Sequence, residues 1–188
     1  MDALIAFFAN MSFWDWTVQG IGVVAATLGI ASFQMKTQRG IVLFQLLGSS
    51  LWTVHFLLLG AAAGGILNAI GIFRGIVFYF RNEHRWARNP VWYGVIGVML
   101  AGATVFSWMH GDGALALLPF AGMVATTVSL GLRDPFRVRA VSFISSPCWL
   151  TYNVINASIP GIVTEIFAMC SIIVGILRID LPKMRKKK

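Results

Sequence analysis

Residues 40–80 read GIVLFQLLGSSLWTVHFLLLGAAAGGILNAIGIFRGIVFYF, two apolar spans joined by a corner rich in Gly and Ala at residues 60–65. Each span is long enough to cross the hydrocarbon core of a bilayer, which takes about 20 residues of helix. The spans also carry polar or amphipathic side chains, namely Gln45, Trp52, His55, Asn68 and Arg74. Polar groups at membrane depth are costly and usually face a bundle interior or a cavity, so we expect these side chains to point inward.

The same segment recurs 97 residues later in the chain. Without a gap between residues 17 and 81, this shift aligns Trp52 with Trp149 and Asn68 with Glu165. Further matched pairs are His55 with Tyr152, Gly64 with Gly161, Ser32 with Ser129, Lys36 with Arg133, Ser49 with Ser146 and Arg81 with Arg178. Because the matches fall on aromatic, polar and basic positions, they predict two structurally equivalent units.

The composition indicates a membrane protein along the whole chain of 188 residues. The chain is 57% hydrophobic and 12% charged, with a mean hydropathy of +0.77, whereas soluble domains carry about 25% charged residues. We therefore expect an all-α, polytopic membrane protein. The net charge of +8 could suggest nucleic acid, but the basic residues lie in short loops and in the tail at 183–188. There they set topology and attract anionic lipid on the cytoplasmic side, so nucleic acid is not expected as a partner.

Seven transmembrane spans are predicted, at about 17–35, 41–59, 62–80, 91–108, 114–132, 138–155 and 161–178. Fourteen of the fifteen Lys and Arg residues fall in the connecting segments 36–40, 81–90, 132–139 and 178–188. The segments at the other ends of the spans contain Asp2, Asp15 and Asp112. The positive-inside rule then places the N-terminus outside and the C-terminus inside.

This topology predicts three helices, one linker helix and three more helices. A three-helix unit that starts outside ends inside, so a parallel copy needs one additional helix to return the chain. The predicted organisation is a first unit at 17–81, a linker with the fourth helix at 82–112, a second unit at 113–178 and a basic cytoplasmic tail at 179–188.

Four helix faces suggest a central cavity between these units. On the second span of each unit they are Gln45, Gly48, Trp52 and His55, matched by Ser142, Ser145, Trp149, Tyr152 and Asn156. On the third spans they are Gly64, Asn68, Gly71 and Gly75, matched by Gly161, Glu165, Ala168 and Ile172. One interpretation is a cavity in which Trp rings stack on a solute while Asn68 and Glu165 form hydrogen bonds with it. The other is ordinary packing through small residues and interhelical hydrogen bonds; the matched depth in both units favours the cavity.

The charged residues inside the spans leave alternatives open. Glu165 must find a partner, reach water or take up a proton, so it is a candidate for proton coupling, a neutral hydrogen-bonding acid or the partner of His55 or Arg74. Arg74 could extend to the basic surface, or contact an anion or carboxylate within the cavity. His55 is a candidate for pH sensing or for a hydrogen bond in the cavity.

The parallel repeat with Trp on the second helix and Asn on the third resembles the SWEET and semiSWEET transporters of the PQ-loop group. In length, and over residues 22–79 in particular, the chain resembles the YgjV-type bacterial inner-membrane proteins. In SWEET proteins a Trp pair and an Asn pair line the sugar pocket, and these roles fall on Trp52 and Trp149, and on Asn68 and Glu165. Glu165 thus replaces the second Asn, and the segment 32–34 lacks the proline expected at the end of the first helix.

We therefore expect an alternating-access transporter of a small polar solute, such as a sugar, an amino acid or a vitamin precursor, in the bacterial inner membrane. The substrate-binding candidates are Trp52, His55, Asn68, Trp149, Tyr152 and Glu165, with Glu165 and Arg74 as candidates for coupling or charge recognition. The alternative is a non-transporting membrane scaffold or assembly protein with the same fold. The sequence contains no Gly-rich phosphate loop, HExxH motif or paired carboxylates, so neither enzymatic activity nor a cofactor or metal is expected.

Overall fold

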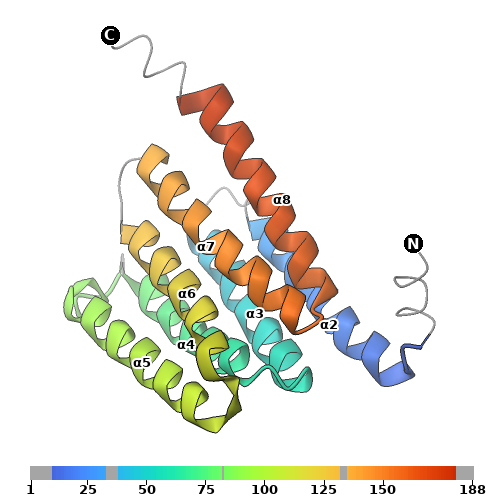
Figure 1. The fold of residues 1–188 in the computed structure, drawn as a ribbon. Coiled ribbons are helices and arrows are strands. Elements are labelled where there is room, and N and C mark those ends of the chain that lie inside the picture. The colour runs from blue at the N-terminus through green and yellow to red at the C-terminus, as the bar shows by residue number, and fades with distance from the viewer. Residues whose placement is uncertain (1–9, 33–37, 82, 132–134, 181–188) are drawn as a thin grey trace.

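The computed structural model describes residues 10–32, 38–81, 83–131 and 135–180, which form a bundle of long helices (Figure 1). The long helices are α2 (Phe13–Ser32), α3 (Gln38–Leu58), α4 (Ala62–Phe80), α5 (Val91–Ser107), α6 (Leu117–Gly131), α7 (Pro135–Ile155) and α8 (Ile159–Gly175). Short helical segments are η1 (Trp86–Arg88), η2 (Trp108–Asp112), η3 (Gly113–Ala116) and η4 (Ile176–Asp180). No strand occurs in these ranges, which confirms the all-α expectation.

Three stretches of the described chain are long and apolar enough to cross a membrane: Ala62–Phe80, Val91–Ser129 and Ile159–Arg178. They cover the predicted third, fourth, fifth and seventh spans. The 39 residues of the second stretch are not one straight helix, because the backbone leaves helical geometry at His110 and Gly111. This break falls between the predicted fourth span, at about 91–108, and the predicted fifth span, at about 114–132.

Helix α2 begins at Phe13, four residues before the predicted start of the first span at about 17. Ser12 and Asp15 explain the difference, because they form a reciprocal cap. The Asp15 N–H donates to the Ser12 hydroxyl oxygen at 3.2 Å, and the Ser12 N–H donates to the Asp15 carboxylate at 2.8 Å. This arrangement satisfies N–H groups that would otherwise lack partners at the helix start. The far end of the predicted span, at 33–35, lies outside the described residues.

The turns that end α3 and α7 have the same backbone hydrogen bonds. After α3, the Ala61 N–H donates to the Phe56 carbonyl at 2.9 Å, around Gly60 with φ of 73°. After α7, the Ser158 N–H donates to the Asn153 carbonyl at 2.9 Å, around Ala157 with φ of 52°. Both turns follow the Schellman pattern, in which a residue with positive φ ends the helix. All three positions correspond under the shift of 97 residues.

Six of the long helices follow one another around a ring. Helices α2, α3 and α4 form the first triplet, with α3 packed between the other two. Helices α6, α7 and α8 form the second triplet, with α7 packed between the other two. The ring is completed by contacts of α2 with α8 and of α4 with α6. Helix α5 packs against α4 and α6 on the outside (Figure 1). The first helix of each triplet therefore contacts the third helix of the other.

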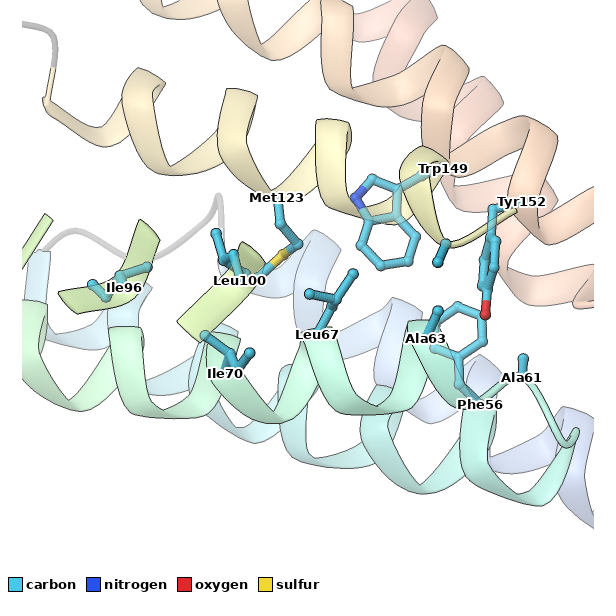
Figure 2. Close-up of a cluster of buried hydrophobic side chains, with 11 residues drawn as sticks. Phe56, Ala61, Ala63, Leu67, Ile70, Ile96, Leu100, Met123, Trp149 and Tyr152 are labelled. Atoms are coloured by element: carbon cyan, nitrogen blue, oxygen red, sulfur yellow. The ribbon is translucent and has the colours of Figure 1, made fainter. Parts of the chain in front are cut away.

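We call the end of the bundle where α3 turns into α4 and α7 into α8 the corner end. The opposite end carries Arg81, Arg85, Arg137 and Arg178, and is called the basic end. The hydrophobic core joins the two triplets, with Phe56, Leu67, Met123, Trp149 and Tyr152 among its buried side chains (Figure 2). Large apolar side chains also face outward: Val98 is 74%, Val163 61% and Ile144 60% exposed. Such an exterior suits lipid, which does not penalise exposed apolar surface.

Candidate ligand cavity

Three stacked aromatic rings join the triplets near the corner end. The Phe56 ring stacks on Trp52 with ring centroids 5.6 Å apart, and on Trp149 with centroids 5.8 Å apart. Phe56 is buried between them, and Figure 2 shows its ring close to Trp149 and Tyr152. The predicted tryptophan pair is thus joined through a third ring, and a solute would meet one continuous aromatic wall.

Below this wall, toward the basic end, lies a cavity of about 410 Å³. Its lining is Gln45, Trp52, Phe56, Asn68, Arg74, Met123, Thr126, Ser129, Ser142, Ser145, Ser146, Trp149, Asn153, Gly161, Thr164, Glu165, Ala168 and Ile172. Both triplets contribute to it, and the residues nearest the basic end include the exposed Gln45. A volume of this order admits a small solute.

The corner end of the cavity is sealed by hydrogen bonds between the triplets. His55 on α3 is fully buried, with Nδ1 2.8 Å from the Val18 carbonyl oxygen and Nε2 2.8 Å from the Ser158 hydroxyl. A carbonyl can only accept, so Nδ1 carries the proton, and Nε2 of the neutral ring accepts from Ser158. On the other side, the Gly64 N–H donates to the Tyr152 hydroxyl oxygen at 2.8 Å. Tyr152 is the repeat partner of His55, so each bond joins the end of the second helix of one triplet to the start of the third helix of the other.

Two more polar side chains hold the starts of the third helices. Asp112 accepts a hydrogen bond of 2.9 Å from the Ala63 N–H in the first turn of α4. Gln19 donates to the Ala157 carbonyl at 2.9 Å and accepts from the Ile159 N–H at 3.2 Å, at the start of α8. Because first-turn N–H groups have no partner within their own helix, these contacts satisfy donors at the corner end.

Glu165 and Arg74 line the same cavity from different triplets and are not paired with each other. Glu165 lies beside Ser146, which lines the same cavity. Arg74 Nη1 donates to the Thr127 hydroxyl on α6 at 2.9 Å. Among the described residues, no ion pair joins Glu165 to Arg74 or His55. Arg74 reaches across to the second triplet through its bond to Thr127.

The structure separates the predicted site residues into two groups. Trp52, Asn68, Trp149, Glu165 and Arg74 line the cavity. His55 and Tyr152 do not; they are fully buried in the seal directly beyond it. In Asn68, the amide nitrogen donates to the Gly64 carbonyl of its own helix at 2.9 Å, which leaves the amide oxygen for a ligand.

The sequence reasoning missed Phe56 and Asn153. They occupy matched positions in the two triplets and follow Trp52 and Trp149 by one helical turn, so the spacing of four residues could have found them. Asn153 is buried, and its amide oxygen has no hydrogen-bond partner among the described residues. A side chain on Gly161 would collide with it, since a Cβ there would lie 2.4 Å from the Asn153 amide oxygen.

A second hollow, of about 380 Å³, lies between α2 and α8. Its walls are mainly apolar, and Val23, Val163 and Phe167 are all more than half exposed. An apolar groove on the outside of the ring suits a lipid chain better than a polar solute. The polar cavity inside the ring is therefore the candidate site.

The chain is similar to known bacterial membrane proteins. The family model described as "bacterial inner membrane protein" (Imp-YgjV) matches residues 16–183. The inner membrane protein YgjV of Escherichia coli strain K12 is 30% identical over 153 residues, which cover 80% of this chain and 77% of that protein. No solved structure matches. Together with the apolar helices, these matches place the protein in the bacterial inner membrane as a multi-pass protein, and the chain belongs to the YgjV family.

Proposed function

We propose that this protein carries a small polar solute across the bacterial inner membrane by alternating access. The observation that carries the proposal is the polar cavity between the triplets, which is sealed at the corner end by hydrogen bonds that cross from one triplet to the other. A transporter needs a site that is closed on one side at a time. Hydrogen bonds between two bodies provide a closure that can be broken and remade as they move.

The proposed architecture is a parallel repeat of three helices, a linker helix and three helices, similar to the SWEET transporters. Three features support it: the shift of 97 residues, the matched turns after α3 and α7, and the reciprocal contacts of α2 with α8 and α4 with α6. In this arrangement α5 is the linker that allows both triplets to run in the same direction. The triplets would rock against each other about the cavity.

The proposed orientation places the basic end in the cytoplasm, as the positive-inside rule requires. The seal formed by His55, Ser158, Tyr152 and Gly64 then lies toward the outside, and the cavity faces the cytoplasm. To release or accept solute on the outer side, the seal must open while the helices close at the basic end. Anionic lipid headgroups would contact the arginines of the basic end.

The first test is thermal unfolding of the detergent-purified protein with a panel of sugars, amino acids and nucleosides. A ligand that binds only the folded state raises the melting temperature by mass action. Trp52→Ala removes an indole from the cavity wall, and Trp92→Ala removes one from α5, outside the ring, as the matched control. We expect one solute class to stabilise the parent and Trp92→Ala but not Trp52→Ala.

The second test is uptake of that solute into vesicles that contain the purified protein. Saturable uptake that Trp52→Ala abolishes and Trp92→Ala retains supports transport. Binding without uptake overturns transport and favours the non-transporting scaffold. If no solute class stabilises the parent, the cavity is not a ligand site and the proposal fails.

A further inference from the structure

We infer that the solute is a zwitterion whose cationic and anionic groups lie several bonds apart, with its cationic group held near the corner end. The inference rests on the proposed function, because it assigns a substrate class to the same cavity. Its basis is the charge of the lining: Glu165 and Arg74 are its only charged members among the described residues. They come from different triplets and form no ion pair with each other.

Opposite charges that face one cavity without pairing favour a ligand that satisfies both. A charge withdrawn from water is stabilised only when it is paired or well hydrogen-bonded. Arg74 donates a hydrogen bond to the neutral Thr127 hydroxyl, and the neutral Ser146 side chain lies beside Glu165. A neutral sugar would leave both charges uncompensated. A simple cation would pair with Glu165 alone, and a simple anion would pair with Arg74 alone.

The acceptors for a cationic group gather near the aromatic wall. Glu165 lies one turn after Gly161 on α8, and Gly161 packs directly against the Asn153 side chain. The Asn153 amide oxygen is buried and has no hydrogen-bond partner within the described part of the chain. The carboxylate and the amide oxygen can each accept from an ammonium group. Trp52, Phe56 and Trp149 line the same part of the cavity and offer aromatic surface, which attracts cations.

The donors for an anionic group lie farther toward the basic end. Arg74 follows Asn68 by six residues, which is about 9 Å along the helix at a rise of about 1.5 Å per residue. Asn68 is the repeat partner of Glu165, so this axial distance also approximates the offset between Arg74 and Glu165. An ω-amino acid or a dipeptide therefore fits better than an α-amino acid, whose two charged groups share one carbon.

The test measures thermal stabilisation of the purified full-length protein by 6-aminohexanoate, with glycine, hexylamine, hexanoate and glucose as comparison probes. The variants Glu165→Gln and Arg74→Gln each remove one charge, and Arg74→Lys keeps it. Glu83→Gln and Arg85→Gln are the matched controls, since both residues lie in the exposed loop after α4. We expect 6-aminohexanoate to stabilise the parent, Arg74→Lys and the controls. Each charge-removing variant should weaken its binding by about tenfold or more, because a charged hydrogen bond is lost.

The remaining outcomes separate this inference from the proposed function. Glucose could stabilise the parent and Glu165→Gln but not Trp52→Ala. That result overturns the zwitterion, and the cavity remains a site for a neutral solute. The zwitterion is also overturned if hexylamine or hexanoate stabilises the protein as much as 6-aminohexanoate does, because one charged group is then enough for binding. If glycine stabilises the protein as much as 6-aminohexanoate does, the ligand's two charged groups need not lie several bonds apart, and that part of the inference is overturned. If no probe stabilises the protein, neither the zwitterion nor the solute site survives.

Discussion

The imidazole Nε2 of His55 lies 2.8 Å from the hydroxyl oxygen of Ser158, although 103 residues separate them in the chain. Both side chains are fully buried. The contact joins the end of α3 to the start of α8, and the bond between Gly64 and Tyr152 joins the corresponding elements with the triplets exchanged. The corner end is thus held by two polar contacts that join corresponding pairs of helices.

Replacing Ser158 with Ala should destabilise the protein, because His55 Nε2 would be buried without a donor. A buried group left without its partner costs about 1–3 kcal/mol of the free energy of unfolding. The measurement is thermal unfolding in detergent, together with uptake of any identified substrate. Ser171→Ala, an exposed serine on the same helix, is the control and should unfold like the parent. Equal stability of both variants would show that the contact does not hold the seal.

Replacing Ala157 with Gly should stabilise the protein. Ala157 has a φ of 52°, a left-handed conformation that costs a residue with a Cβ about 1–2 kcal/mol and that Gly adopts freely. The gain should be about 1 kcal/mol, since Gly also loses more conformational entropy on folding. The reciprocal change, Gly60→Ala at the matched turn with φ of 73°, should destabilise by a similar amount. Chemical unfolding in mixed micelles measures both, and opposite signs are the expected result.

Replacing Gly122 with Ala should impair ligand binding more than folding. A Cβ at Gly122 would lie 2.5 Å from the Trp149 indole, so the ring must move. We expect weaker binding of any cavity ligand, measured by thermal shift. Gly97→Ala on α5 is the matched control, because a Cβ there meets nothing within 4 Å. Unchanged binding in Gly122→Ala would mean that Trp149 does not form the wall of the site.

Replacing Asp112 with Ala should weaken the start of α4. The Asp112 carboxylate accepts from the Ala63 N–H at 2.9 Å, and its negative charge also favours a helix N-terminus. Loss of a capping side chain costs about 0.5–2 kcal/mol. Asp112→Asn keeps an acceptor oxygen and should recover part of that loss in thermal unfolding. If the two variants unfold alike, the hydrogen bond contributes little and the charge accounts for the effect.

The sequence predicted helix boundaries best where apolar runs meet Gly-rich turns. The third span was placed at about 62–80, and α4 occupies Ala62–Phe80. The predicted boundary was wrong at the start of α2, because the cap formed by Ser12 and Asp15 is polar and lies before the apolar run. Periodicity reports the apolar run, whereas a helix start is decided by where its free N–H groups find acceptors.

The sequence also selected most of the cavity lining, because polar residues in apolar spans must face inward. It could not separate the cavity from the seal, since His55 and Trp52 share one helical face. It missed Phe56, whose apolar ring looks like lipid-facing surface on its own helix. Only the other triplet, which supplies Trp149 as a stacking partner, turns Phe56 into part of the wall.

By itself, the sequence determined that the chain is a helical membrane protein, because apolar runs and the positions of basic residues depend on local composition. The tertiary structure alone decided which polar residues meet. Glu165 and Arg74 lie on helices that are distant in sequence, and nothing in their spacing states whether they pair. Packing places them on one cavity without an ion pair, while His55 and Tyr152 reach across to the opposite triplet. Such pairings depend on how two units dock, and docking is a property of surfaces that form only when the chain has folded.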